Sequence, residues 1–504
     1  MNSIRFGGGA VLVGLLAACA TETQPAAKAS GQSVSSTEIN VTNDLKYRWG
    51  EHALAINPKN PKNIVYLTVG VGFTKDCQEH GTDCQMVPAD FGFPGMRPIP
   101  QPRGIFENRN FNVVAAYSSF DGGKTWKRTL VPVSPVGHPE IYGGGDPSVA
   151  VGPDGTFYAS FDANNWGTPE HVLPNAGAGV SLSKDGGRNW SAPVLPGTPV
   201  DGPKIVIDQS TGTLYESSST NLGPHADGNP NSPKGDIIDR WLVSSKDGVH
   251  WSSPPKRLGG TDGTKQFAAH AFLSAAHGIL GAGHVQTDPA ACAFFVGSQQ
   301  APCAVFQATT DDGATWTRYR VPFTVEVSGP VLYTAADPTK KGHFSVMATR
   351  KGGNEFHIFQ SLDAGRTWSG PAIVTEDANR VHFKPWFEYS PQGVLGIMWR
   401  THQPRPGETV PATMQGGPGG GPQFAYDVWA AISKDGGATF SEPLKVSNQD
   451  SSVPQSGMFG NAGDDYSSIA LYSDNVYVGW SHWLGDDRQG YLRAIKLSEF
   501  HQKQ

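Results

Sequence analysis

Residues 119–126 of the chain read SFDGGKTW, and variants of this octapeptide occur five more times along the sequence. The clearest second copy is SKDGGRNW at residues 183–190, and the others lie at 245–251, 310–316, 361–368 and 433–440. The general form is S/T-x-D-x-G-x-T-W, with the aspartate at Asp121, Asp185, Asp247, Asp312, Asp363 and Asp435. A motif that returns every 51 to 72 residues indicates a fold made of repeated units.

Each residue type in the motif has a structural reason. The aspartate accepts hydrogen bonds from the backbone N–H groups of a tight turn, and the glycine supplies a positive φ. The terminal Trp or Phe is a large apolar anchor that can pack between neighbouring sheets. We therefore expect the six aspartates to be structural rather than catalytic.

A second pattern precedes the motif: two apolar strands joined by a tight turn, such as GPDG at residues 152–155. Seven such pairs occur, at 52–69, 147–161, 205–215, 268–283, 331–347, 386–398 and 468–480. With a third strand before each aspartate turn and a fourth after it, each unit is a four-stranded antiparallel blade of a β-propeller. The sequence therefore predicts an all-β, seven-bladed propeller in one domain over residues 37–500.

The last unit lacks an aspartate turn, because its third strand, Tyr491–Leu497, is followed by the end of the chain. Residues 37–42 can supply the missing outer strand. This pairing would close the ring and remove an exposed sheet edge.

The motif resembles the Asp box (BNR repeat) of the sialidase (neuraminidase) superfamily and of related bacterial propeller lipoproteins, over nearly the whole chain. The resemblance implies an exo-acting glycoside hydrolase that needs no cofactor. It implies three arginines that clamp the substrate carboxylate, a tyrosine nucleophile activated by a glutamate, and an aspartate acid/base. The F/Y-R-I-P motif of that family is not found, and MRPIP at residues 96–100 is only a scrambled form of it.

The long connections between second and third strands mark one face of the ring as the functional face. First strands start there, second strands end there, and third strands start there. Catalytic candidates at these positions are Arg48, Arg350, Arg400, Tyr426 (with Tyr466 as the alternative tyrosine), Asp146, His382 and Asp464. Substrate-binding candidates are His52, Trp166, His284, His482 and Trp483, and further polar candidates are Glu51, Asp162, Asn164, Lys204, Arg240, His270, Lys384, His402, Asp427 and Asp465.

Two other functions remain open for this face. The histidines could act as acid/base groups or hold a divalent metal together with Asp146 or Asp464. Alternatively, the face could bind a glycan or a protein without turnover. Three converging arginines above a tyrosine–glutamate pair would favour a sialidase, and clustered histidines and carboxylates would favour a metal site.

The N-terminus predicts export. One positive charge and a short apolar core over residues 1–18 are typical of a signal peptide, and LAAC at residues 16–19 resembles the bacterial lipobox, with Cys19 lipidated. Residues 19–36 form a flexible tether in this interpretation, which places the protein in the bacterial cell envelope, periplasmic or at the cell surface. An oxidising compartment favours two local disulfides, Cys77–Cys84 and Cys292–Cys303, with a metal site at Cys77, His80 and Cys84 as the alternative.

Composition narrows the choice of partners. The 504 residues carry a net charge of −6 without a lysine or arginine run, so nucleic acid is not expected as a partner. A carbohydrate ligand and a monomeric protein are expected instead.

Overall fold

The computed structural model describes residues 38–44, 47–72, 84–87, 99–102, 112–138, 141, 143–164, 177–219, 240–258, 266–267, 273–286, 292, 303–324, 332–350, 354–377, 379–408, 425–448, 450–451, 466–484 and 487–503. Statements on the structure concern these residues. The predicted signal peptide (1–18), the lipidated Cys19 and the tether (19–36) lie outside them. Ser36–Gln504 forms one compact unit.

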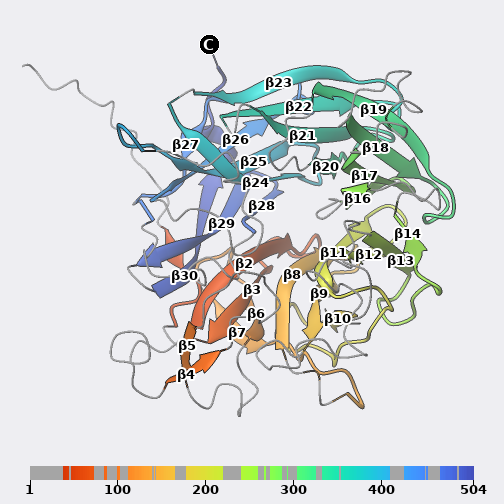
Figure 1. Cartoon of the computed structure of the whole chain (residues 1–504), viewed down its shortest axis with the longest axis vertical. Coiled ribbons are helices and arrows are strands. Elements are labelled where there is room, and N and C mark those ends of the chain that lie inside the picture. The colour runs from red at the N-terminus through yellow and green to blue at the C-terminus, as the bar shows by residue number, and fades with distance from the viewer. Residues whose placement is uncertain are drawn as a thin grey trace, which may run out of the picture. The chain divides into compact units, whose positions relative to one another are not determined.

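Seven antiparallel sheets follow one another around an axis, from the red and orange blade 1 to the blue blade 7 (Figure 1). Blade 1 contains β2 (Tyr47–Ile56), β3 (Ile64–Gly72), β6 (Asn112–Ser119) and β7 (Lys127–Leu130). Blade 2 contains β8 (Gly143–Val151), β9 (Phe157–Asn164) and β10 (Gly177–Ser183). Blade 3 contains β11 (Asp201–Asp208), β12 (Thr213–Ser219), β13 (Arg240–Ser245) and β14 (Lys256–Arg257). Blade 4 contains β15 (Gln266–Phe267), β16 (Leu273–Ala276), β17 (Ile279–Gln286), β18 (Cys303–Thr309) and β19 (Thr317–Thr324).

The remaining blades follow the same order. Blade 5 contains β20 (Tyr333–Ala336), β21 (Phe344–Arg350), β22 (Glu355–Ser361) and β23 (Ser369–Glu376). Blade 6 contains β24 (Val381–Tyr389), β25 (Leu395–His402), β26 (Asp427–Ser433) and β27 (Leu444–Lys445). Blade 7 contains β28 (Ser468–Tyr472), β29 (Asn475–Leu484), β30 (Asp487–Lys496) and β1 (Ile39–Asn40). A separate hairpin, β4 (Cys84–Val87) with β5 (Ile99–Pro102), lies between β3 and β6 in sequence.

The first strands of the blades surround the axis. β2, β8, β11, β16, β20, β24 and β28 contact one another in this order, and β28 contacts β2. The seven-bladed propeller predicted from the sequence is therefore confirmed. Two blades differ from the expected four strands. Blade 2 has three strands among the described residues, and the isolated bridge Val180–Val194 stands in the place of a fourth. In blade 4 the inner strand is divided into β15 and β16.

Both ends of the described chain meet in blade 7. β1 pairs antiparallel with β30, with Ile39 opposite Leu492 and Asn40 opposite Tyr491. The N–H of Val41 also donates to the carbonyl of Gly490 at 2.8 Å. The outer strand of the last blade thus comes from the N-terminal side of the domain, as predicted for residues 37–42.

The motif aspartates organise turns between third and fourth strands. In the first copy, Asp121 Oδ1 accepts the N–H groups of Lys124 and Thr125 and the hydroxyl of Ser119, at 2.8 to 3.0 Å. Its Oδ2 accepts the Thr125 hydroxyl at 2.6 Å. The hydrogen bond from the Thr125 side chain is the largest of the contacts that lower the pKa of Asp121 to about 2. These contacts support the structural role predicted for the motif.

The motif aspartate of the fourth copy is Asp311, so the prediction of Asp312 was wrong by one residue. Asp311, not Asp312, accepts the Thr309 hydroxyl at 2.7 Å and both the N–H and the hydroxyl of Thr315 at 2.9 and 2.6 Å. Asp312 instead has a positive φ of 55° and accepts the hydroxyl of Tyr215 at 2.7 Å. Because residues 309–312 read TTDD, the letters allow two registers, and only the backbone distinguishes them.

The aromatic residue that ends each motif packs on the preceding blade, as predicted. Trp316 of blade 4 packs with Tyr215 of blade 3, and Phe440 of blade 6 belongs to a core shared with blade 5. The ring of Trp368 in blade 5 lies edge-on to Phe306 of blade 4, at 5.3 Å. The motif therefore forms a turn within one blade and an apolar contact with the preceding blade.

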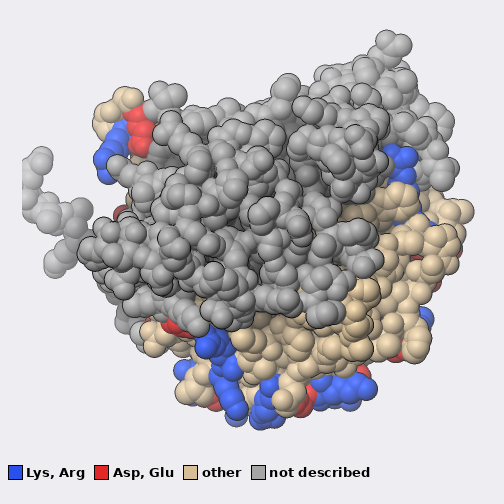
Figure 2. All heavy atoms as spheres, turned by 60° about the horizontal axis from the view of Figure 1, so that its bottom comes forward, with Lys and Arg blue, Asp and Glu red and all other residues tan. Residues whose placement is uncertain are grey.

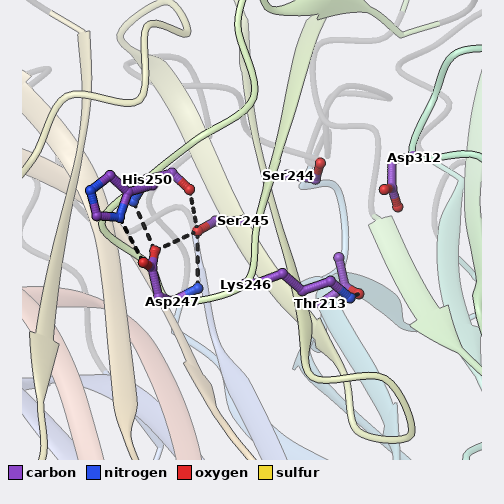
Figure 3. Close-up of a pocket in the computed structure, with 7 residues that line it drawn as sticks. All are labelled: Thr213, Ser244, Ser245, Lys246, Asp247, His250 and Asp312. Atoms are coloured by element: carbon purple, nitrogen blue, oxygen red, sulfur yellow. Dashed lines mark hydrogen bonds and ion pairs between the residues drawn. The ribbon is translucent and has the colours of Figure 1, made fainter.

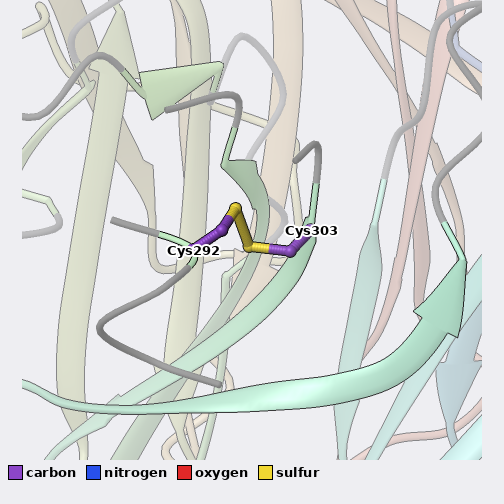
Figure 4. Close-up of a disulfide and its surroundings, with 2 residues drawn as sticks. All are labelled: Cys292 and Cys303. Carbon is purple, nitrogen blue, oxygen red and sulfur yellow. A yellow bond between two sulfur atoms is a disulfide. The ribbon is translucent and has the colours of Figure 1, made fainter. Parts of the chain in front are cut away.

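The disulfide predicted between Cys292 and Cys303 is present and joins the segment after β17 to the start of β18 (Figure 4). Cys77 lies outside the described residues, so the Cys77–Cys84 pair stays a prediction. None of the described residues belongs to a helix with the length and apolar character needed to cross a bilayer. Figure 2 shows one face of the molecule. In the described part of this face, lysine and arginine side chains are interspersed with acidic ones.

Candidate functional site

The polar residues predicted to surround the axis lie at matching ends of their strands. Residues near the start of first strands are Arg48, Glu51, His52, Asp146, Lys204, His382 and Lys384. Residues near the end of second strands are Asp162, His284, Arg350, Arg400, His402, His482 and Trp483, and those at the start of third strands are Arg240, Tyr426 and Asp427. In antiparallel blades these positions belong to one face. Trp166, His270, Asp464, Asp465 and the side chain of Asn164 lie outside the described residues.

Four of the inner strands carry the same irregularity at this end. The register of β2, β8, β11 and β24 shifts against the second strand, as in a β-bulge. Each bulge contains one residue with a positive φ: Glu51, Asp146, Gly202 and Lys384, at 53°, 47°, 59° and 46°. Proline follows three of them, in the dipeptides at 146–147, 202–203 and 384–385. The bulges were not predicted, although this repeated X-Pro dipeptide marks their positions in the sequence.

Tyr466 and Asp146 form the centre of the candidate site. The hydroxyl of Tyr466 donates to Asp146 Oδ2 at 3.0 Å, and the backbone N–H of Asp146 donates to Glu51 Oε2 at 2.9 Å. Tyr466 precedes β28 of blade 7, whereas Glu51 and Asp146 come from blades 1 and 2. The bulge thus brings together residues that are 320 and 95 positions from Asp146 in sequence.

Asp146 also belongs to a cluster of three carboxylates. Asp146, Asp162 and Asp201 each offer an oxygen within 4.8 Å of the others. Asp162 is buried, with 4% of its surface exposed. Burial, followed by the charges of Asp146 and Asp201, raises the pKa of Asp162 well above that of an ordinary aspartate. Asp201 was not among the residues singled out from the sequence.

Two cations complete the site. Lys204 Nζ lies 3.4 Å from the centroid of the Tyr466 ring, and burial lowers the pKa of Lys204 to about 8. Arg240 is fully buried and donates to the carbonyls of Gly202 and Ser217, at 2.7 and 2.9 Å. The ring of Trp386 lies near Tyr466 and Lys204, at 6.2 Å from the Tyr466 ring and 5.7 Å from Lys204 Nζ.

The three arginines expected to clamp a substrate have different described neighbours. Arg48 lies over the ring of Trp483 at 5.8 Å, and Arg400 lies over Tyr426 at 4.9 Å. Arg350 ends β21, opposite Glu355 in the same blade. Convergence of the three guanidinium groups in one pocket stays a prediction.

Tyr426 is less suited than Tyr466 to act as a nucleophile. Tyr426 and Tyr466 are similarly buried, at 3% and 6% exposed, but the hydroxyl of Tyr426 donates to the backbone carbonyl of Ser481 at 2.5 Å. The alternative tyrosine considered from the sequence, Tyr466, is therefore the one that contacts a carboxylate among the described residues.

Four histidines of this face, His52, His284, His382 and His482, are buried. His52 Nε2 lies 3.0 Å from Ser481 Oγ, and His382 Nδ1 lies 3.0 Å from Thr401 Oγ1. His284 and His482 are each 3% exposed. Burial lowers the pKa of His382 to about 4, so this histidine is neutral at physiological pH. The described contacts of His52 and His382 are those of structural histidines.

Two cavities lie along the described strands. The larger, about 500 Å³, follows the axis between the inner strands of all seven blades, and Lys204 and Trp386 line it. The smaller, about 320 Å³, lies at the Asp box of blade 3, with Thr213, Lys246, Asp247, His250 and Asp312 in its wall (Figure 3). In this box, His250 Nδ1 contacts Asp247 Oδ2 at 2.7 Å, in the place of the threonine hydroxyl of other copies. The second cavity is therefore part of a structural turn.

Comparison with known proteins gives structural similarity alone. No protein-family model matches the chain, and no curated protein matches it in sequence. Similar solved structures include a protein of unknown function from Dyadobacter fermentans, with a TM-score of 0.43, 12% identity, and coverage of 91% of this chain and 97% of that one. A Trypanosoma rangeli sialidase in complex with sialic acid has a TM-score of 0.42, 12% identity, and coverage of 91% and 58%. An α-L-arabinofuranosidase from Fusarium graminearum has a TM-score of 0.40, 14% identity, and coverage of 73% and 97%.

Sialidases are thus among the solved structures to which this chain is similar. At these TM-scores and identities the similar structures carry no information about activity. The propeller fold follows from the strand pairings of the chain itself.

Proposed function

We propose that this protein is a glycan-processing hydrolase that removes a terminal, acidic sugar, with Tyr466 as its nucleophile. The observation that carries the proposal is the hydrogen bond of 3.0 Å from the Tyr466 hydroxyl to Asp146 Oδ2 at the axis of the propeller. A tyrosine held by a carboxylate is one of the nucleophiles that glycoside hydrolases use. Asp146 orients the phenol oxygen for attack on the anomeric carbon.

The neighbouring side chains suit an acidic sugar. Lys204 and Arg240 come from one blade and supply positive charge beside Tyr466. Ammonium and guanidinium groups bind carboxylates through charge-assisted hydrogen bonds. Trp386 supplies an aromatic surface 6.2 Å from the tyrosine ring, and sugars stack on such surfaces.

Turnover of a panel of chromogenic glycosides, including terminal acidic sugars, tests the proposal on the parent protein and on Tyr466→Phe. This substitution removes one hydroxyl and keeps the ring that packs against Trp386. We expect kcat/KM to fall by about a hundredfold or more, because the nucleophilic oxygen is lost. The melting temperature should stay near that of the parent.

Tyr472→Phe is the matched control. Tyr472 lies in the same blade and lines the axial cavity, but its hydroxyl donates to the carbonyl of Pro58. Turnover by Tyr466→Phe equal to that of the control would refute the assignment of the nucleophile. Saturable sugar binding without turnover by the parent would refute the hydrolase and favour a binding protein.

The Cys292–Cys303 disulfide supports an oxidising, extracytoplasmic compartment for this activity. Anchoring through a lipid on Cys19 and the monomeric state are parts of the same proposal. Mass spectrometry of the membrane fraction and the mass in solution would test them.

A further inference from the structure

The carboxylates of Asp146, Asp162 and Asp201 lie in one cluster, in which Asp146 also orients Tyr466 but Asp162 and Asp201 have no role in the proposed hydrolysis. They come from β8, β9 and β11 in two neighbouring blades. We propose that they bind one divalent cation of the size of Ca²⁺. The inference does not depend on turnover, because it concerns binding of the ion alone.

The spacing of the oxygens fits this ion. All three lie within 4.8 Å of one another. Ca²⁺ binds carboxylate oxygens at about 2.3–2.6 Å, so two oxygens on one ion are separated by at most about 5 Å. Oxygens within this limit can bind one Ca²⁺ together, so the cluster is compatible with an ion of this size.

Asp162 gives an independent reason to expect a ligand. Only 4% of its surface is exposed, and its Oδ1 has no hydrogen-bond partner among the described residues. A buried carboxylate oxygen without a partner is costly, because it has lost water and gained nothing in exchange. The neighbouring Gly145 leaves room here, since a Cβ at that position would lie 3.4 Å from Asp162 Oδ2.

Among the described residues whose charges act on the cluster, carboxyl groups outnumber cations. Four carboxylates, Glu51, Asp146, Asp162 and Asp201, interact with two cations, Lys204 and Arg240. Lys204 makes no ion pair within 4.0 Å with any residue in the described part of the chain, and its ammonium lies against the ring of Tyr466. One divalent cation would balance this excess.

The remaining contacts of the three aspartates are compatible with an ion. Asp146 uses Oδ2 for the Tyr466 hydroxyl, which leaves Oδ1 for the cation. Asp201 Oδ2 accepts the Ser219 hydroxyl at 3.1 Å, and this hydrogen bond holds the carboxylate toward the end of blade 3. An ion at this place would join blades 2 and 3 and lie one carboxylate away from Tyr466.

Two measurements on the full chain test the inference after treatment with chelator. Calorimetric titration with Ca²⁺ should give one saturable site, and thermal unfolding should move to higher temperature when Ca²⁺ is added. Tb³⁺, which replaces Ca²⁺, should show luminescence sensitised by Tyr466 and Trp386, and excess Ca²⁺ should quench it.

Variants locate the site. Asp162→Asn and Asp201→Asn should each weaken Ca²⁺ binding by about tenfold or more, because each removes a charged ligand. Asp474→Asn is the matched control, since it makes the same change on an exposed turn of blade 7. Glu388→Gln is a second control, because it removes a carboxyl group from the wall of the axial cavity, and Glu388 is not one of the three clustered residues. Both controls should bind Ca²⁺ as the parent does.

The inference is overturned if Ca²⁺ produces neither a saturable heat nor a shift in thermal unfolding. It is also overturned if Asp162→Asn and Asp201→Asn bind the ion as tightly as the controls. Ca²⁺ binding by a protein that hydrolyses no glycoside would support this inference and refute the proposed hydrolase, so the two failures are distinguishable.

Discussion

Glu216 lies fully buried in β12, near Arg240 and below the candidate site. It accepts a hydrogen bond from the Thr198 hydroxyl, but its Oε1 has no hydrogen-bond partner in the described part of the chain. Burial is the largest influence and raises the pKa of Glu216 to about 8, although Thr198 and Arg240 act in the opposite direction. A single buried carboxyl thus couples the stability of the propeller to pH.

Glu216→Gln should remove this coupling. The unfolded chain ionises Glu216 near the ordinary value of 4.5, whereas the folded chain keeps the proton up to about 8. The contribution of Glu216 to stability is therefore fully present below pH 4.5 and lost as the pH rises through about 8. We expect the variant and the parent to differ little at about pH 5 and the variant to be more stable at about pH 9, by on the order of a few kcal/mol. Urea unfolding at both pH values measures this, and a difference independent of pH would contradict it.

The Asp-box turn is the structural element that recurs in this fold. The residue directly after the motif aspartate has a positive φ in each copy and is glycine in four of them: Gly122, Gly186, Gly248 and Gly436. Asp312 and Ala364 occupy the same position with φ of 55° and 58°. Residues other than glycine are strained in this region, so Asp312 is an exception to the pattern, whereas Asp311 follows it.

The same substitution at the two adjacent aspartates should change the free energy of unfolding by different amounts. Asp311→Gly removes the acceptor of three hydrogen bonds from Thr309 and Thr315 and should lower the free energy of unfolding by about 2 kcal/mol or more. Asp312→Gly loses the bond from Tyr215 but relieves the positive φ, so its effect should stay within about 1 kcal/mol. Chemical unfolding of both variants measures the difference. Equal destabilisation would show that the turn does not depend on Asp311.

The stability of the whole propeller depends on closure of the ring between blades 7 and 1. β1 covers the outer edge of β30, and the buried Val41 and Thr42 continue the contact. Thr42 Oγ1 donates to Gln489 Oε1 at 2.8 Å, and Asp44 forms an ion pair with Arg128 of blade 1. The segment 38–44 thus connects the last blade to the first.

Deletion of residues 1–44 should open this connection, while deletion of residues 1–36 is the control. The longer deletion removes Val41 from the core and exposes the backbone of β30. We expect a loss of at least about 3 kcal/mol in stability. An unpaired strand edge also favours association between chains. Thermal unfolding and size-exclusion chromatography measure both effects, and identical behaviour of the two deletions would rule out a role for β1 in closure.

The sequence by itself determined the repeat, the number of blades, the strand order and the closing strand. These follow from local patterns, because an Asp-box turn and an alternating strand need only their immediate neighbours in sequence. It did not determine the register of TTDD at residues 309–312, where two readings fit the same letters.

Only the tertiary structure decided which of the polar residues at the strand ends meet. Four inner strands bulge at the same height, and the bulges bring Glu51, Asp146 and Lys204 toward Tyr466. The same packing buries Arg400 and, among the candidate histidines, His52, His284, His382, His402 and His482. Strand ends can be located from the sequence, but their contacts depend on backbone register and on packing between blades, which join residues hundreds of positions apart.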